Sequence, residues 1–360
     1  MIKRNSLINF FLFCLSISIP IVLADSILKI LRLPSANSRV MLLAGGEFTS
    51  NTKTYVKAYT PNKLIRQAAV YGKSLEFDYK FYTDKYGFRK GLDCRDNKNK
   101  ISIAITGDSY TDAQGSETVW ITPLQKLLCK KGINSNNVSA SGIGIIDMKN
   151  HLIFAKNTIG SEKAIIAMVP EDIYRGSFPM ESNDRCSGLV TRPFSLCKTP
   201  GTWWHVPMSI TKNDAIKFAN KKYNLGLISS IKVVLRDLKT TLYDYKNESN
   251  NATNPRIKAS VDSVKEISKI YGKGNIFILI MPTKNDRLLE GNKKELLKRN
   301  QDLKLFLNSI DQQITFSDIR SCPLNKEHFF NLDGHPNSSG QDLLGKCAVN
   351  DEALIKFLKL

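Results

Sequence analysis

The sequence predicts an α/β protein built around a parallel β-sheet, and two observations support this prediction. Beyond Lys100, short apolar runs rich in β-branched residues alternate with longer segments of helical periodicity. The first run, Ile101–Ile105, passes without a linker into small polar residues that extend to Asp112. Strands that alternate with helices in this way form parallel sheets joined by right-handed crossover connections.

The elements of this pattern follow in order along the chain. Apolar runs predict strands at Ile101–Ile105, Asn137–Ala140, Ala164–Val169, Asn275–Ile280 and Ile314–Ser317. Helical periodicity predicts helices at Thr118–Lys130, Asp147–Asn157, Ser260–Tyr271, Lys293–Ser309 and from Ser338 to about Leu358. We expect Asn337 or Ser338 to cap the last helix, since short polar side chains satisfy the free N–H groups of a first turn.

Three segments organise the chain. Residues 1–33 form an N-terminal membrane anchor or signal segment, residues 34–98 a mixed extension, and residues 99–360 the α/β domain. Within this domain the alternation stops between Tyr174 and about Arg256, a stretch too long for a simple crossover. We therefore expect an insertion at about residues 175–256.

The N-terminal segment combines basic residues with an apolar run. Lys3 and Arg4 precede the run from Ser6 to Ala24, which contains no charged residue and is long enough to cross a bilayer as a helix. Apolar residues continue to Leu33, which favours an uncleaved transmembrane helix. Cleavage near Ala24, which makes the protein secreted, is the alternative. In both cases we expect the rest of the chain outside the cytoplasm, on the periplasmic side of a bacterial cell envelope.

The cysteines fit an oxidising location. Apart from Cys14 in the apolar run they are even in number, which allows complete pairing in disulfides. Proximity in the sequence favours Cys186–Cys197 and Cys322–Cys347, leaving Cys94–Cys129, among the 15 pairings that six cysteines allow. Because the sequence has no CxxC pair and no Cys/His cluster, we expect no metal site and no cofactor.

The composition is that of a basic globular protein. Lysine and arginine total 52 against 33 acidic residues, for a formal net charge of +19, and 42% of the residues are hydrophobic. The lysines are scattered and no nucleic-acid-binding module is present, so nucleic acid is not an expected partner. Solubility is the plain interpretation of the charge; acidic surface glycans and anionic lipids are the alternative partners.

A serine at the end of the first strand is the strongest candidate for chemistry. In an open parallel sheet, ligands bind at the carboxyl ends of the strands, where Ser109 follows the first run. A nucleophilic serine needs a base and a group that orients the base. The best base among the four histidines is His335, because Asp333 precedes it by two residues in a turn sequence. By contrast, we expect His151 on a helix surface.

These two motifs resemble those of a known family. Gly107-Asp108-Ser109 and Asp333-Gly334-His335 resemble the first and last motif blocks of the SGNH (GDSL-type) hydrolases. The longer stretch GDSYTDAQGSETVW and the preceding DKYGFR resemble exported members associated with surface-polysaccharide acylation. The resemblance implies a flavodoxin-like three-layer α/β/α sandwich with a parallel sheet.

The resemblance also implies a role for each site residue. Ser109 is the implied nucleophile, and its own N–H is one donor to the oxyanion. Gly142, in SASGIGI, matches the second block, whose backbone N–H is another donor. His335 is the implied general base and Asp333 its orienting partner.

The third block departs from the family pattern. The family has asparagine followed by aspartate; here Glu171 stands at the asparagine position before Asp172. An ionised carboxylate only accepts hydrogen bonds and repels an oxyanion. Three explanations stay open: Glu171 is protonated or turned away, another residue donates, or catalysis is weak.

The resemblance points to an ester hydrolase. We expect a serine-dependent enzyme that removes acyl groups, specifically O-acetyl groups, from a cell-surface polysaccharide. An O-acyltransferase that passes the acyl group to a polysaccharide hydroxyl is one alternative. A non-catalytic glycan-binding subunit, which Glu171 favours, is the other.

Overall fold

The computed structural model describes most of the α/β domain and the strands before it. The described residues are 13, 15–24, 26–27, 39–51, 56–72, 74–92, 94, 101–175, 203–222, 255–288, 293–310 and 312–359. Within these ranges no helix has the length and apolar character that a bilayer crossing requires. The structure therefore gives no support to the transmembrane helix predicted for residues 1–33, of which residues 1–12, 14, 25 and 28–33 lie outside the described ranges.

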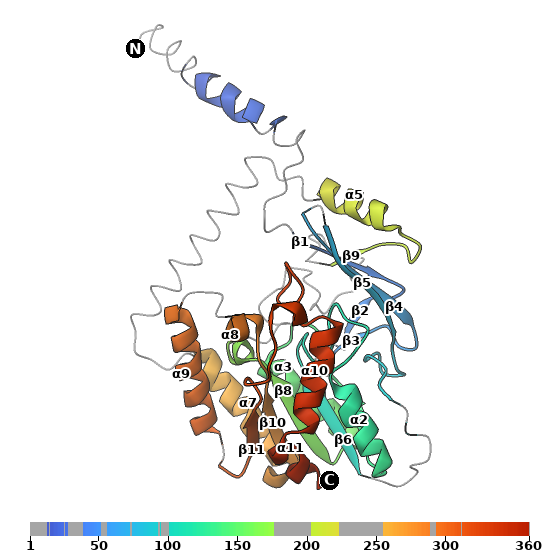
Figure 1. Cartoon of the computed structure of the whole chain (residues 1–360), viewed down its shortest axis with the longest axis vertical. Helices are drawn as coiled ribbons and strands as arrows, with labels where there is room; N and C mark the ends of the chain where they lie inside the picture. The colour runs from blue at the N-terminus through green and yellow to red at the C-terminus, as the bar shows by residue number, and fades with distance from the viewer. Residues whose placement is uncertain are drawn as a thin grey trace. The chain divides into compact units, whose positions relative to one another are not determined.

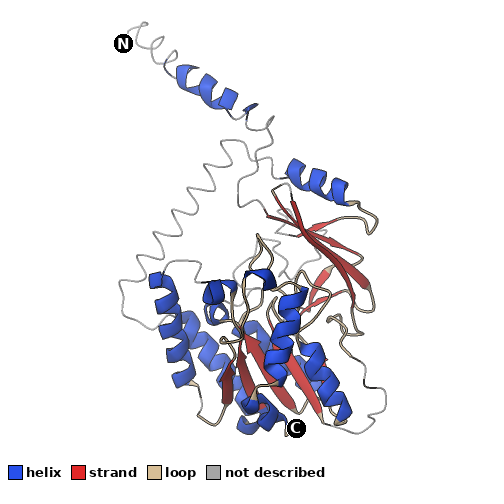
Figure 2. Ribbon diagram, viewed as in Figure 1, coloured by secondary structure: helices blue, strands red, loops and turns tan. Residues whose placement is uncertain are grey.

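The central sheet has five parallel strands, shown in Figures 1 and 2. Their order is β11-β10-β8-β6-β7. The bounds are β6 (Ser102–Gly107), β7 (Asn134–Asn137), β8 (Lys163–Met168), β10 (Ile276–Ile280) and β11 (Thr315–Asp318). Numbered along the chain this order is 2-1-3-4-5, the flavodoxin-like arrangement, and the strand order reverses between β6 and β8. The α/β fold with a parallel sheet is confirmed.

Helices cover both faces of this sheet, giving the three layers seen in Figure 2. One hydrophobic core joins the sheet to α3 (Ile145–Phe154), α7 (Pro255–Tyr271) and α9 (Lys293–Ser309). The other joins it to α2 (Ile121–Lys130), α10 (Ser338–Val349) and α11 (Glu352–Leu358). Along β6, Ala104 enters the first core while Ile103 and Ile105 enter the second, as the alternation of side chains in a strand requires.

Short elements connect these layers. They are the π-helix Ala155–Ile159, the 3₁₀ helices Pro170–Tyr174, Lys273–Asn275 and Lys326–His328, and α8 (Lys284–Leu288). Two predicted elements lie elsewhere than expected. The second strand precedes its predicted range because Val138–Ala140 is buried loop, not sheet. The last helix breaks in two because Asp351 caps α11 by accepting a hydrogen bond from the Leu354 N–H.

The predicted extension, residues 34–98, contributes a smaller set of strands, which we call the β-module. It comprises β1 (Arg39–Ala44), β2 (Phe48–Asn51), β3 (Val56–Tyr59), β4 (Leu64–Tyr71) and β5 (Ser74–Tyr82), with β9 (Trp203–His205) from the predicted insertion. One sheet has the order β5-β4-β1-β9, and β2 pairs with β3. Val56, Ala58 and Phe88 belong to the core formed by α3, α7 and α9, so β3 packs directly on the α/β layers.

The chain divides into two compact units. One, of residues 41–69, 76–209 and 253–360, holds the central sheet and most of the β-module. The other, of residues 1–40, 70–75 and 210–252, contains α5 (Lys212–Lys222). The candidate site described below belongs to the first unit.

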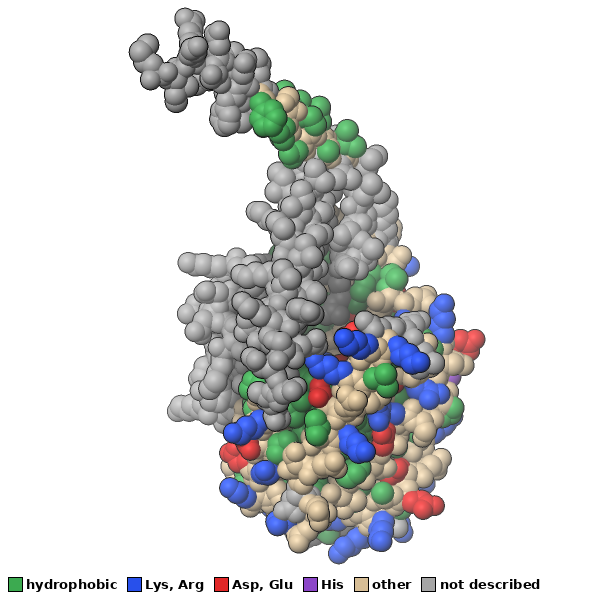
Figure 3. All heavy atoms as spheres, turned by 90° about the vertical axis from the view of Figure 1, so that its left-hand side faces the viewer, with side chains coloured by type: hydrophobic (Ala, Val, Ile, Leu, Met, Phe, Trp, Pro, Cys, Tyr) green, Lys and Arg blue, Asp and Glu red, His purple; other side chains and the backbone are tan. Residues whose placement is uncertain are grey.

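Two of the three predicted disulfides are present. Cys94 pairs with Cys129 and Cys322 with Cys347. Cys186 and Cys197 lie outside the described residues. Basic side chains lie scattered among acidic ones on the face shown in Figure 3, as expected of a solvated surface.

Candidate active site

The nucleophile turn begins where β6 ends. Gly107 is the last strand residue, and a Cβ there would meet Thr111 Oγ1 at 2.2 Å and the Ala167 carbonyl oxygen at 2.5 Å, so only glycine fits. Asp108 then closes the turn: its Oδ1 accepts the Tyr110 N–H at 2.8 Å, and its carbonyl accepts the Thr111 N–H. Ser109 is left at the carboxyl end of the sheet, beside the point where the strand order reverses.

A chain of hydrogen bonds joins Ser109 to the last loop of the domain. His335 Nε2 lies 2.7 Å from Ser109 Oγ, and His335 Nδ1 is bonded to Asp333 Oδ1. The same Asp333 oxygen accepts the His335 backbone N–H at 2.9 Å, which fixes the turn as well as the ring. Because Asp333 accepts at Nδ1, the neutral ring carries its proton there and offers a free Nε2 lone pair to the serine.

The residues joined by these hydrogen bonds are largely buried. Ser109 is 5% exposed and Asp333 1% exposed, so the bonds are shielded from competing water. The Tyr110 hydroxyl donates to the Gly334 carbonyl at 2.7 Å, and its ring lies 5.3 Å from that of His335. Burial raises the pKa of Tyr110 well above its ordinary value, so the hydroxyl stays a donor.

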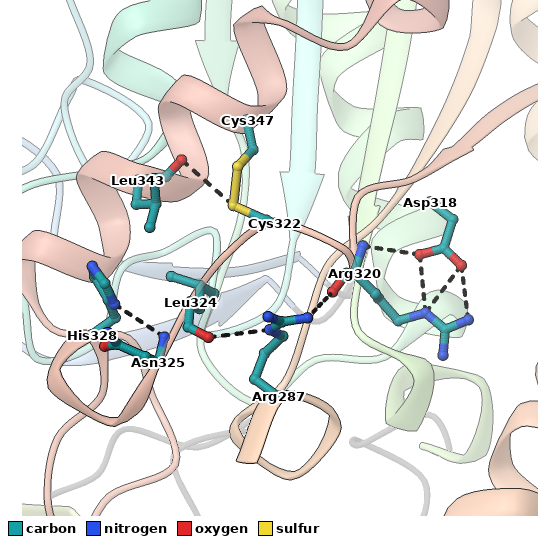
Figure 4. Close-up of a disulfide and its surroundings, with 9 residues drawn as sticks. All are labelled: Arg287, Asp318, Arg320, Cys322, Leu324, Asn325, His328, Leu343 and Cys347. Carbon is teal, nitrogen blue, oxygen red and sulfur yellow. Dashed lines mark hydrogen bonds and ion pairs between the residues drawn. A yellow bond between two sulfur atoms is a disulfide. The ribbon is translucent and has the colours of Figure 1, made fainter. Parts of the chain in front are cut away.

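Several contacts hold the His335 loop in place. Lys284 Nζ donates to the Phe330 and Asn331 carbonyls at 2.8 and 2.9 Å. Asn337 caps α10 by accepting the Gly340 N–H at 3.1 Å, as predicted for Asn337 or Ser338. Arg287 holds the segment that precedes this loop, donating to the Leu324 and Arg320 carbonyls next to the Cys322–Cys347 disulfide, as Figure 4 shows.

Two backbone donors face no acceptor. Among the described residues, the N–H groups of Ser109 and Gly142 make no hydrogen bond. Gly142 has φ = 79°, a conformation that favours glycine and permits close approach to its peptide. Buried donors without partners are rare, and an oxyanion held between them would satisfy both.

Glu171, at the asparagine position, is turned onto an arginine. Its Oε1 is bonded to Arg299 Nη1, while Arg299 Nη2 is bonded to Asp286. Burial raises the pKa of Glu171, and the charge of Arg299 opposes this effect. Arg299 belongs to α9 and is nearly buried, so the ion pair is partly shielded from solvent. Glu171 is thus engaged as a structural ion-pair partner.

Arg175 is a charged group that sequence reasoning missed. Its Nη1 lies 3.0 Å from Asp108 Oδ2, 2.8 Å from Asp172 Oδ1 and 2.9 Å from the Ile143 carbonyl oxygen. Asp108 Oδ2 is in turn 3.4 Å from Ser109 Oγ. Burial acts to lower the pKa of Arg175, but Asp172 and Asp108 raise it above its ordinary value, so the guanidinium keeps its charge.

Arg89, which follows the strand β5 in the chain, binds the loop that follows Ser109. Arg89, 4% exposed, donates through both terminal nitrogens to four carbonyls at 2.7–3.1 Å, those of Asp112, Ala113, Ser116 and Glu117. It therefore stabilises a loop that includes the left-handed residue Ala113, with φ = 54°. The one sequence signal for this contact is that Arg89 ends the DKYGFR stretch.

Metal chemistry has no candidate group in this part of the chain. Among the described residues no cluster of three or more His, Cys, Asp or Glu side chains could hold an ion.

His151, expected on a helix surface, is instead fully buried. Its Nε2 accepts the Lys57 N–H at 3.1 Å and its Nδ1 is 2.6 Å from the Val138 carbonyl oxygen, which gives it a packing role.

Comparison with known proteins returns structures only. No protein-family model matches the sequence, and no curated protein does. The matching solved structures include proteins described as esterases, a putative acylhydrolase and GDSL-like lipases.

Three of these structures illustrate the range. A Clostridium thermocellum family 3 carbohydrate esterase has 12% identity and a TM-score of 0.37, with 72% of this chain and 98% of that one covered. The esterase EstA of Pseudoalteromonas sp. has 12% identity and a TM-score of 0.39, with 72% and 99% covered. A GDSL-like lipase of Parabacteroides merdae has 12% identity and a TM-score of 0.37, with 73% and 97% covered. Likenesses at this level carry no weight for function, for which the site geometry is the evidence.

Proposed function

We propose that the chain is a serine-dependent hydrolase of the SGNH type that cleaves carboxylic esters. The observation that carries the proposal is the series of hydrogen bonds from Asp333 through His335 to Ser109 Oγ, at the carboxyl end of a parallel sheet. A nucleophile bonded to a base, and a base bonded to an orienting carboxylate, is the arrangement that activates a serine at neutral pH.

The mechanism follows from the positions of these groups. Ser109 Oγ attacks the ester carbonyl as His335 Nε2 takes its proton, and Asp333 stabilises the imidazolium that forms. The oxyanion accepts hydrogen bonds from the N–H groups of Ser109 and Gly142. Collapse of the tetrahedral intermediate expels the alcohol, which takes the proton from His335. Water, deprotonated by His335, then attacks the acyl-serine; the second intermediate collapses, Ser109 Oγ leaves with the proton from His335, and the carboxylic acid is released.

The substrate that we propose is an O-acetylated cell-surface polysaccharide. Support comes from the resemblance of the Ser109 motif to exported proteins of polysaccharide systems and from the net charge of +19, which suits an acidic glycan. Transfer of the acyl group to a sugar hydroxyl would use the same acyl-serine with a different acceptor.

We further propose that the protein acts outside the cytoplasm, held by residues 1–33 at the membrane of a bacterial cell envelope. Support comes from the uncharged run after Lys3 and Arg4 and from the two disulfides. Alkaline extraction of membranes tests the anchor: protein recovered in the soluble fraction, or lacking residues 1–24 by mass spectrometry, contradicts it.

The esterase assay uses the full chain in detergent with p-nitrophenyl acetate. We expect Ser109→Ala to abolish turnover, while Ser309→Ala, which removes an exposed helix hydroxyl, leaves it unchanged. A fluorophosphonate probe should label the wild type on the peptide that contains Ser109. Equal turnover by wild type and Ser109→Ala, without labelling, contradicts the hydrolase proposal and leaves the glycan-binding alternative. Product acylated on an added glycan acceptor would identify the transferase.

A further inference from the structure

We propose that Lys57, from the β-module, is a positioning residue of the oxyanion site. It holds and polarises the peptide group between Ser141 and Gly142, whose N–H belongs to Gly142. This inference rests on the proposed function and extends it to a residue of the N-terminal extension. Lys57 lies in β3 and is 5% exposed, so its side chain is enclosed within the protein.

The central observation is a hydrogen bond to the peptide before Gly142. Lys57 Nζ donates to the Ser141 carbonyl oxygen at 2.6 Å. The carbonyl of Ser141 and the N–H of Gly142 belong to one planar trans peptide and point in opposite directions. A cation that fixes the carbonyl therefore aims the Gly142 N–H away from Lys57, and this N–H makes no hydrogen bond among the described residues.

The same peptide is also tied to the nucleophile loop. Ser141 Oγ donates to Asp112 Oδ2 at 2.6 Å, and the Tyr59 hydroxyl donates to the same oxygen at 2.6 Å. The Asp112 N–H in turn bonds the Asp108 carbonyl, at the start of the turn that carries Ser109. The peptide of Gly142 and the turn of Ser109 are thus fixed to one carboxylate.

The charge of Lys57 also strengthens the Gly142 N–H as a hydrogen-bond donor. An ammonium on a peptide carbonyl draws electron density from the adjoining N–H and makes it a stronger donor, an effect that a low local dielectric enlarges. Burial lowers the pKa of Lys57 to about 7, and the charges of Asp112 and Asp147 oppose the shift. Lys57 therefore loses its charge in the neutral range, unlike an exposed lysine.

Two other titratable groups that face Lys57 have pKa values shifted away from the neutral range. Burial lowers the pKa of His151, on α3, to about 4, and raises that of Tyr59 well above its ordinary value. The facing carboxylates are Asp112 in the nucleophile loop and Asp147 on α3, and the Phe48 ring lies 4.2 Å from Lys57 Nζ.

Kinetics of three variants test the role. We expect Lys57→Met to lower kcat about 10- to 100-fold with KM changed less than about twofold, because the oxyanion forms only after substrate binds. Lys57→Arg, which keeps the charge at all pH values, should recover most of kcat and remove the decline in kcat above about pH 7. The control Lys63→Met removes an exposed lysine of the same module and should change nothing. A wild-type kcat and pH profile in Lys57→Met would overturn the proposal.

A second measurement does not depend on activity. The sequence contains Ser–Gly pairs only at Ser141–Gly142, Ser187–Gly188 and Ser339–Gly340. Cell-free labelling with carbonyl-¹³C serine and ¹⁵N glycine therefore leaves few amide signals, and Gly142→Ala assigns the one needed. We expect that amide to titrate with a midpoint near pH 7 in the wild type and to stop titrating in Lys57→Met. A signal that does not titrate, or titrates equally in both, overturns the inference. Turnover that is absent or independent of Ser109 in the full chain contradicts the proposed function alone.

Discussion

The Cys322–Cys347 disulfide should stabilise the protein strongly while leaving the chemistry of the folded site nearly unchanged. The two cysteines are 25 residues apart and enclose the loop that carries Asp333 and His335. A cross-link of this kind acts mainly by reducing the conformational entropy of the unfolded chain. In the folded protein the loop has other attachments, notably Lys284 on the Phe330 and Asn331 carbonyls.

The size of the effect follows from the length of the loop. For a separation of 25 residues, the chain-entropy relation gives about 3.5 kcal/mol at 25 °C. The Cys94–Cys129 bridge, with a separation of 35 residues, serves as a matched control with an expected contribution of about 3.8 kcal/mol. Since small domains are stable by only about 5–15 kcal/mol, either loss is large.

Urea unfolding and ester hydrolysis together test this reasoning. The variants are the double substitutions Cys322→Ala/Cys347→Ala and Cys94→Ala/Cys129→Ala, measured beside the wild type with and without a reductant. We expect each to lower the free energy of unfolding by about 3–4 kcal/mol, with kcat of the folded protein within about threefold of wild type. A loss below about 1 kcal/mol for the Cys322–Cys347 pair, or a collapse of kcat without urea, would refute the entropic account.

Four further results are expected. Asp333→Asn should lower kcat about 10⁴-fold in the ester assay, because the amide no longer fixes the tautomer of the base; a loss below tenfold contradicts the assigned orienting role. Glu171→Asn should raise kcat at least about tenfold by supplying a donor at the asparagine position; no gain places that position outside the oxyanion site. Arg89→Met should cost at least about 3 kcal/mol in urea unfolding, since four buried carbonyls lose their donor; an unchanged midpoint argues against the anchoring role. Burial lowers the pKa of His151 to about 4, so the unfolded chain binds more protons between about pH 6.5 and 4 and wild-type stability should fall as pH drops through that window; His151→Gln should show a shallower fall, and equal slopes contradict the prediction.

The parts of the fold that the sequence predicts are those with local signals. The strands β6, β8 and β10 are apolar runs of a few residues, and their alternation with helical patterns predicts the parallel sheet. The pairing of Ser109 with His335 was also predictable, since each residue lies in a short motif with an Asp beside it. The exception is β7, Asn134–Asn137, an edge strand made of polar residues that apolar patterning cannot detect.

Contacts between distant segments left no local signal. Lys57 reaches Ser141 across 84 positions, and its neighbours in the sequence give no indication that the ammonium is buried. His151 looked like a surface residue because its helix is polar at that turn, yet β3 covers it and donates the Lys57 N–H to it. Both contacts depend on β3, from residues 34–98, which joins the core formed by α3, α7 and α9, and no local pattern in that segment indicates this packing.

The ion pairs near Ser109 explain how the site tolerates a glutamate where the related motif has an amide. An asparagine is neutral, whereas Glu171 is bonded to Arg299, which also bonds Asp286, so the arginine offsets only part of the added negative charge. What the exchange removes is a donor, since Glu171 Oε1 already accepts from Arg299.

The Asp108 carboxylate lies beside Ser109: its Oδ2 is 3.4 Å from Ser109 Oγ and would repel a developing oxyanion. Arg175 offsets this repulsion, because its guanidinium bonds both that oxygen and Asp172. In the proposed mechanism, direct hydrogen bonding to the oxyanion comes from the N–H groups of Ser109 and Gly142, so the orientation of the Gly142 peptide matters more than in a site that also has the amide.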